Sequence, residues 1–111
     1  MNRERVEKEL MRMGFHIGVA GFRCLIDALD LIYSEDKSPY VPHMMELYKA
    51  VGRRNGCSQS NAERNIRYAI KTYYDRNPEY PVELTPDFRK GTLSNREFLM
   101  RLRSMMKERF G

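Results

Sequence analysis

The sequence has few of the residues and patterns on which most enzymes and metal sites depend. It holds two cysteines and two histidines, and neither His16 nor His43 has a second histidine or a cysteine three or four positions away, which excludes the usual zinc spacing. No glycine-rich phosphate loop is present, and no serine stands in the context of a nucleophile. Asp27 and Asp30 lie three positions apart on a predicted helix and are interpreted as solvated flank residues rather than a catalytic pair. We therefore predict that the protein is not an enzyme and has no catalytic residues, no metal and no cofactor.

Long apolar runs are also missing. No stretch approaches the roughly 18 residues that a membrane span needs, and the charged N-terminus, MNRERVEKEL, lacks the apolar centre of a signal peptide. Two cysteines do not make a disulfide framework. Cys24 lies in an apolar helical pattern and Cys57 directly before a predicted helix, and we expect both to be reduced thiols. These absences predict a cytoplasmic protein without membrane association.

The net charge of the chain is positive, and the basic residues are unevenly distributed along it. The chain has 111 residues, enough for a single domain over 1–111, and a net charge of +5. Residues 43–76 hold seven Lys/Arg against three Asp/Glu, and residues 89–111 hold seven against two. Two basic zones are typical of a protein with a polyanionic partner, most often nucleic acid. The alternative is a soluble protein that is basic without such a partner.

Helical periodicity predicts an all-α fold. No alternation typical of a strand persists for five residues. Ser38, Pro39 and Pro42 mark a break, and residues 77–93, with three prolines and a glycine, are predicted to form a loop with at most one short helical turn. The predicted helices cover residues 3–13, 19–34, 43–54, about 58–76, and a last segment opened by the capping-box pattern SNRE at 94–97.

The segment 58–76, SQSNAERNIRYAIKTYYDR, has two contrasting faces when it is placed on a helix. The apolar face carries Ala62, Ile66, Ala69, Ile70 and Tyr73. The polar face carries Ser60, Glu63, Arg64, Arg67 and Lys71 within an arc of about 100°. Arg pairs with guanine edges, and Lys and Ser hold phosphates. The alternative interpretation is the solvated face of an ordinary bundle helix.

A second helical pattern, HMMELYKAVGRRN, precedes this segment and is closed by Gly56. Its inward residues are predicted to be Met44, Leu47, Tyr48 and Val51. A helix, a short turn with glycine and a second helix with a polar face form the layout of a helix-turn-helix, here at about 43–76. Ser58 can cap the second helix, or Ser60 with Glu63 can form a capping box.

Three segments carry a resemblance to a known family. They are HIGVAGFRCLIDALDLIY at 16–33, AERNIRYAI at 62–70 and SNREFLMRLRSMM at 94–106. With these segments the chain resembles the C-terminal effector domain of the stage zero sporulation protein A, a response regulator of endospore-forming bacteria. The resemblance implies a compact six-helix domain that contains a helix-turn-helix, binds short promoter boxes with a T-G-T-C-G-like core, and activates or represses transcription.

The resemblance also implies roles for individual residues. Glu63, Arg64 and Arg67 would contact bases in the major groove, and the predicted backbone contacts are Ser58, Ser60, Asn61 and Lys71. Asn61 stands where the family usually has a basic residue, and Tyr68 replaces a histidine. The surface after the recognition helix is implicated in contact with an RNA polymerase sigma subunit, although residues 77–93 diverge most from the family.

Two functions follow from these patterns. The first is sequence-specific binding of double-stranded DNA as a transcription regulator, monomeric in solution and paired on DNA, since no receiver domain occurs in these residues. The alternative is a helical protein–protein adaptor without DNA binding. The polar arc of residues 60–71 distinguishes them, because a DNA reader needs these donors and an adaptor does not.

Overall fold

The computed structural model describes residues 1–33, 43–86 and 91–111. These residues contain helices and no strand, so the predicted all-α fold class is confirmed. The elements are α1 (Arg3–Met13), α2 (Phe22–Tyr33), α3 (Met44–Asn55), α4 (Gln59–Arg76), the 3-10 turn η1 (Val82–Leu84) and α5 (Asn95–Phe110). The predicted break at 38–42 lies outside the described residues.

The expected number of six helices is wrong for the part of the chain that is described, which has five α-helices and one 3-10 turn. Between α4 and α5 the chain forms η1, where Pro81 precedes the turn. Prolines at 78, 81 and 86 remove backbone donors and prevent a longer helix there. The predicted loop with at most one short helical turn is therefore confirmed over residues 77–86 and 91–93, and residues 87–90 lie outside the described residues.

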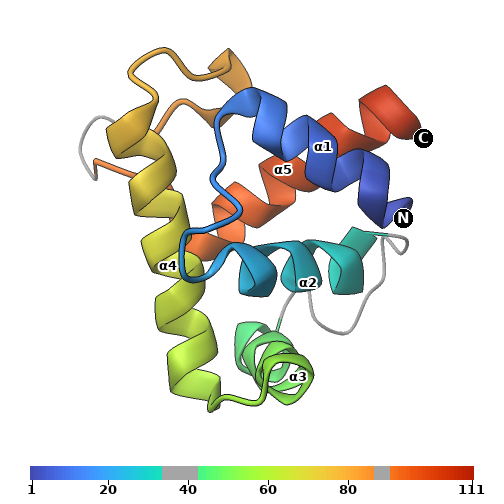
Figure 1. The fold of residues 1–111 in the computed structure, drawn as a ribbon, viewed down its shortest axis with the longest axis vertical. Helices are drawn as coiled ribbons and strands as arrows, with labels where there is room; N and C mark the ends of the chain where they lie inside the picture. The colour runs from blue at the N-terminus through green and yellow to red at the C-terminus, as the bar shows by residue number, and fades with distance from the viewer. Residues whose placement is uncertain (34–42, 87–90) are drawn as a thin grey trace.

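Helix α2 lies at the centre of the domain and positions the others. It packs against α1, α3, α4 and α5, and Figure 1 shows it crossing the middle of the molecule, with α4 along one side and α3 below. Its long apolar stripe is the cause, because Leu25, Ala28 and Leu29 are completely buried. The helix begins at Phe22 rather than at the predicted residue 19, since Gly21 has a left-handed φ of 100°.

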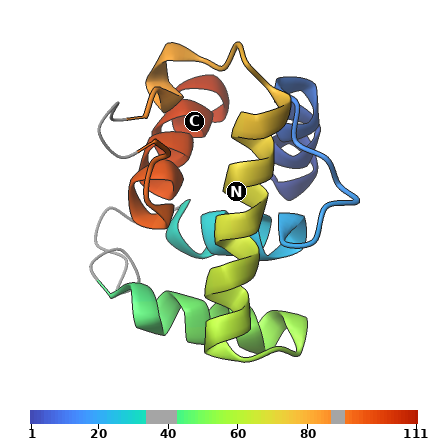
Figure 2. The same cartoon turned by 90° about the vertical axis from the view of Figure 1, so that its left-hand side faces the viewer.

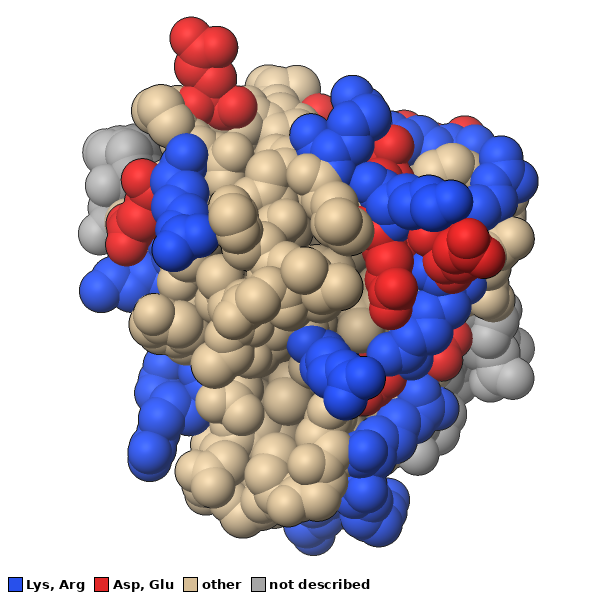
Figure 3. All heavy atoms as spheres, viewed as in Figure 1, with Lys and Arg blue, Asp and Glu red and all other residues tan. Residues whose placement is uncertain are grey.

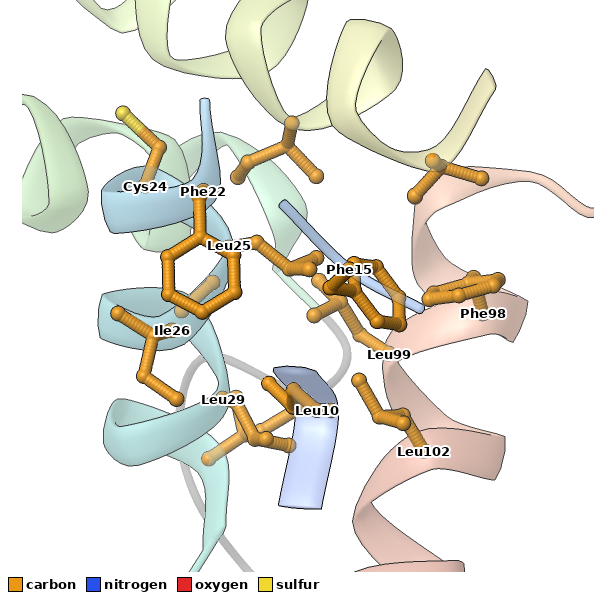
Figure 4. Close-up of a cluster of buried hydrophobic side chains, with 14 of the residues drawn as sticks. Leu10, Phe15, Phe22, Cys24, Leu25, Ile26, Leu29, Phe98, Leu99 and Leu102 are labelled. Atoms are coloured by element: carbon orange, nitrogen blue, oxygen red, sulfur yellow. The ribbon is translucent and has the colours of Figure 1, made fainter. Parts of the chain in front are cut away.

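The core joins α1, α2, α4 and α5 through large apolar side chains. Figure 4 shows Phe15, which follows α1, directed at Phe98 of α5. Phe15 stacks on Tyr73 of α4 with ring centroids 4.2 Å apart, and Phe98 meets both rings edge-on at 6.0 Å. Burying each such side chain contributes roughly 1.5–3 kcal/mol. This cluster fixes the inner face of α4, so its opposite face is held toward solvent.

The loop between α1 and α2 runs along α4 and is attached at both ends. At one end, Asn77 donates a side-chain hydrogen bond to the carbonyl of Gly14 (3.3 Å) and another to that of Tyr73 (2.7 Å). At the other end, a Cβ on Gly21 would lie 1.9 Å from the carbonyl oxygen of Asn65, so only glycine permits this approach. The loop thereby braces α4 over much of its length.

One polar residue of α2 is buried, against the prediction. Asp27 is 6% exposed, where a solvated flank residue was expected. Its carboxylate pairs with Arg3 of α1 (2.6 Å) and accepts a hydrogen bond from the side-chain amide of Asn55 on α3 (2.8 Å). Its neighbour Asp30 remains partly exposed and pairs with Arg54 at 3.1 Å. The periodicity of α2 alone gives no sign that α1 and α3 supply partners on this side.

Candidate nucleic-acid interface

Helices α3 and α4 form a helix-turn-helix whose turn is tightly specified. Gly56 adopts the left-handed conformation after α3, with φ 64°, as its position after the helix suggested. Gly52 is needed for a different reason, since a Cβ there would come within 2.5 Å of the carbonyl oxygen of Cys57. The Ser58 hydroxyl accepts a hydrogen bond from the backbone N–H of Asn61 at 3.1 Å. Of the two predicted starts for α4, the structure therefore has the Ser58 cap.

The inner face of α4 matches the predicted apolar stripe. Its five members, Ala62, Ile66, Ala69, Ile70 and Tyr73, are all buried. This burial anchors the helix to α2, α3 and α5. The polar side chains are consequently displayed on the outside, and Figure 2 shows α4 in front of the rest of the fold, with α3 at its N-terminal end.

The outer face of α4 carries cations that have no acidic partner among the described residues. Its exposed residues are Ser60, Asn61, Arg64, Arg67, Tyr68, Lys71, Asp75 and Arg76. Within the described residues, Arg64 and Lys71 form no ion pair, and they lie seven positions apart, which is two turns on one side. Figure 3 shows basic side chains along the edge formed by α4, with an uncharged strip beside them. Such cations are available to a polyanion.

Glu63 and Arg67 are coupled to one another. The Arg67 Nη1 atom lies 2.9 Å from the Glu63 Oε1 atom across one turn of α4. The Arg67 side chain is 63% exposed and that of Glu63 only 33%, so Glu63 lies at the border of the outer face. The carboxylate therefore orients the guanidinium in the free protein, and two of the residues predicted to contact bases are paired with each other.

The start of α5 is joined to both helices of the motif. The side-chain amide of Asn95 donates to the hydroxyl of Tyr48 on α3 (3.1 Å) and to the backbone carbonyl of Glu63 on α4 (3.3 Å). Burial raises the pKa of the Tyr48 hydroxyl, which keeps it neutral. The contacts of Asn95 border a shallow hollow beside Arg67. This hollow is also lined by Thr92, Leu93, Ser94 and Arg96. The hollow extends the outer surface of α4 toward α5.

The second basic zone serves mainly to hold the fold together. Arg103 is buried, and its Nε donates to the last two backbone carbonyls of α2 at 2.8 and 3.2 Å. Arg101 donates to carbonyls around η1, and Arg109 pairs with Glu9 of α1. Residues 89 and 90 lie outside the described residues. The count of charges along the sequence therefore overstated how much positive surface α5 offers to a partner.

The outer face also contains an aromatic residue that was not among the predicted DNA contacts. Tyr68 is 55% exposed. It follows Arg64 by four positions, so the two residues are neighbours on the surface of the helix. At 100° per residue, position 68 lies about 40° beyond Arg64, just outside the predicted polar arc, so periodicity alone did not include it. Asp75 continues the same face and limits the positive stretch at its C-terminal end.

Comparison with protein families identifies the chain. The family model described as "Sporulation initiation factor Spo0A C terminal" matches residues 6–106. The chain belongs to this family. The family is the DNA-binding effector domain of a sporulation response regulator, not a catalytic domain. Searches of curated proteins and of solved structures gave no significant match. Among the described residues no helix has the length and apolar character to cross a bilayer.

Proposed function

We propose that this Spo0A C-terminal-type domain is a sequence-specific, double-stranded DNA-binding transcription regulator in which α4 enters the major groove. One observation carries the proposal: Arg64 and Lys71 extend from the outer face of the second helix of a helix-turn-helix, without acidic partners among the described residues. The 18 residues of α4 span about 27 Å at 1.5 Å per residue. A major groove about 12 Å wide admits a helix of this kind.

The proposed base contacts are Glu63, Arg64 and Arg67. An arginine fork can grip O6 and N7 of guanine together, and a carboxylate can accept from the amino group of cytosine. A promoter box with a T-G-T-C-G-like core supplies both bases. The ion pair between Glu63 and Arg67 supports this assignment, because it holds the arginine in one orientation before DNA arrives.

The proposed backbone contacts are Ser58, Ser60, Asn61 and Lys71. Three of them lie at the start of α4, where free backbone N–H groups and the helix dipole favour a phosphate. Ser58 uses its oxygen to accept from Asn61, so the hydroxyl proton remains available to a phosphate oxygen. Lys71 lies two turns further along and suits a phosphate as a point charge.

The partners we propose are promoter boxes in double-stranded DNA and an RNA polymerase sigma subunit, in the cytoplasm. We further propose that the domain is a monomer in solution and pairs on adjacent boxes. Analytical ultracentrifugation with and without a two-box duplex tests the pairing. A tight dimer in the absence of DNA would contradict it.

The central test is the salt dependence of duplex binding. Each phosphate that the protein neutralises contributes about −0.9 to the slope of log affinity against log salt. Lys71→Ala should weaken binding to all sequences alike and make the slope shallower by about one unit. Lys8→Ala is the matched control, since Lys8 is an exposed lysine on α1 that pairs with Glu4 at 3.3 Å. It should change little beyond long-range charge.

The outcomes separate the two functions considered for this chain. Selection from a random duplex library should return one enriched box if the domain reads sequence. A flat salt slope, together with no enriched box, would reject DNA binding and leave the helical adaptor.

A further inference from the structure

One tyrosine of α4 is exposed, whereas the other two contribute to the core. Tyr73 is buried, and Tyr74 packs edge-on against Tyr80 with ring centroids 5.1 Å apart. Tyr68, in contrast, is 55% exposed, and no other aromatic side chain that the structure describes is as open to solvent. Among the described residues its hydroxyl has no hydrogen-bond partner, and its ring lies against no other ring or cation. The described part of the fold therefore makes no use of this ring.

The position of Tyr68 on α4 places it beside two cations of the outer face. It follows Arg64 by four positions and precedes Lys71 by three, so both are its neighbours on the helix surface. At 100° per residue it lies about 40° from Arg64 and about 60° from Lys71. Glu63 and Arg67 lie on the other side of Arg64. The ring therefore borders the proposed DNA-reading surface on the side opposite the ion pair of Glu63 and Arg67.

The helix surface beyond Tyr68 turns inward to α2. Asn65 is only partly exposed, and its side-chain amide lies 3.9 Å from the Cys24 sulfur of α2. Thr72, one turn after Tyr68, is also only partly exposed. Figure 3 shows an uncharged surface beside the basic side chains of α4. At this level of α4, Tyr68 is therefore the residue at the edge of the outer face, where a partner in front of the helix can still contact it.

The chemistry of the major groove indicates what such a ring could contact. The base edges there display hydrogen-bond donors and acceptors and one apolar group, the C5-methyl group of thymine. A tyrosine has an apolar ring with a polar tip, so the ring can cover a methyl group while the hydroxyl remains in water. Tyr68 lies about 6 Å from Arg64 along the helix axis, at 1.5 Å per residue, and this is less than two base-pair steps of about 3.4 Å.

We propose that Tyr68 is a specificity-determining residue whose ring packs against the C5-methyl group of a thymine, within about two base pairs of the base that Arg64 contacts. This inference rests on the proposed function, because it needs α4 to lie in the major groove. It adds selection of thymine on the side of α4 opposite Glu63 and Arg67. Covering one methyl group should raise the affinity about fourfold, from the free energy of burying a group of that size.

The experiment replaces each thymine of the selected box in turn by deoxyuridine, which removes the methyl group and keeps the base pairing. Fluorescence anisotropy measures the affinity of the whole protein for each duplex. The unchanged protein should lose about fourfold in affinity at one thymine of the box. Tyr68→Ala should bind the unmodified box at least about fourfold more weakly and no longer respond to loss of that methyl group. Tyr68→Phe should keep the response, because the ring is intact.

Lys71→Ala is the matched control for these duplexes. Lys71 is exposed on the same face, three positions after Tyr68, and its proposed partner is a phosphate. Its removal should weaken binding to all duplexes alike and leave the response to the methyl group unchanged. Tyr68→Ala should keep the circular dichroism spectrum and the melting temperature of the unchanged protein, because the ring has no partner in the described part of the fold.

Three results would overturn this inference while leaving DNA binding intact. The first is an affinity that does not change when deoxyuridine replaces any thymine of the box. The second is a Tyr68→Ala protein that still responds to the methyl group, since another residue would then contact it. The third is a Tyr68→Phe protein that binds all duplexes more weakly, because the hydroxyl would then be a phosphate contact. A flat salt slope with no enriched box would instead reject the proposed function, and this inference with it.

Discussion

Arg67→Ala is the substitution that most directly examines whether α4 reads bases. In the free protein it removes one ion pair of 2.9 Å on the surface of a helix, with the arginine 63% exposed. Pairs of this kind contribute about 0.3–0.5 kcal/mol. No buried apolar contact is lost, because the side chain lies opposite the inner stripe. The free energy of unfolding should therefore fall by no more than about 0.5 kcal/mol.

The effect on DNA binding should be much larger. Losing a two-pronged contact with one guanine costs about 1–3 kcal/mol, which is roughly a 5- to 150-fold rise in Kd at 1.4 kcal/mol per factor of ten. The loss should be concentrated at one base pair, since only the base that Arg67 contacted loses its discrimination. Arg64→Ala should relax a different position if both arginines read bases.

The assay is fluorescence anisotropy with the selected box and with every single-base variant of it, and circular dichroism confirms folding. Arg12→Ala is the matched control, because Arg12 is an exposed arginine on α1 that pairs with the nearby Glu9. Glu63→Gln separates orientation from charge: loss of discrimination at the same position as in Arg67→Ala identifies Glu63 as its orienting partner. If Arg67→Ala weakens every variant equally, Arg67 is a phosphate clamp and the base-reading role is wrong.

Four further substitutions concern the fold that holds α4, and urea denaturation measures the effect of each. Burial raises the pKa of Tyr74 to about 12, so the stability that its neutral hydroxyl contributes is complete below the unfolded pKa near 10 and is lost as the pH rises toward 12. Partial exposure limits this contribution to about 1–2 kcal/mol, and Tyr74→Phe should flatten the loss of stability at alkaline pH. Tyr73→Phe removes a buried hydroxyl that has no partner among the described residues. It should leave stability unchanged or raise it by up to about 1 kcal/mol. Arg103→Ala should cost about 3 kcal/mol, because it removes charged hydrogen bonds to two carbonyls together with buried packing; a loss below about 1 kcal/mol would contradict a structural role. Gly21→Ala should cost about 2 kcal/mol or more, since its Cβ would meet the carbonyl of Asn65 and its φ is left-handed; a neutral result would show that the loop can move.

The features that depend on neighbours along the chain could be predicted from the sequence. Helix α1 has the predicted bounds, 3–13, and the inner stripe of α4 is the predicted one. The serine caps at Ser58 and Ser94 could be predicted as well, because each hydroxyl accepts a hydrogen bond from the backbone N–H three residues ahead. Periodicity and capping are local, so a single chain displays them directly.

The features that depend on distant partners could not be predicted. Asp27 and Arg103 are charged residues on helices, and periodicity gave no reason to bury either. Each is buried because another element supplies its partner: Arg3 and Asn55 for Asp27, and the end of α2 for Arg103. A linear sequence carries no signal for such pairings without the fold.

Basic side chains that bind other groups within the fold are not available to DNA, and this affects how the domain would bind it. The net charge of +5 suggests a broadly positive protein, yet Arg54, Arg103 and Arg109 are engaged with carboxylates or carbonyls of the fold. What remains for a polyanion on α4 is a narrow line that includes Arg64 and Lys71 and is limited at its C-terminal end by Asp75. Few neutralised phosphates imply a shallow salt slope and weak non-specific binding. In the proposed function, affinity for one box would then come from the bases themselves, and occupancy of a promoter from two copies on adjacent boxes.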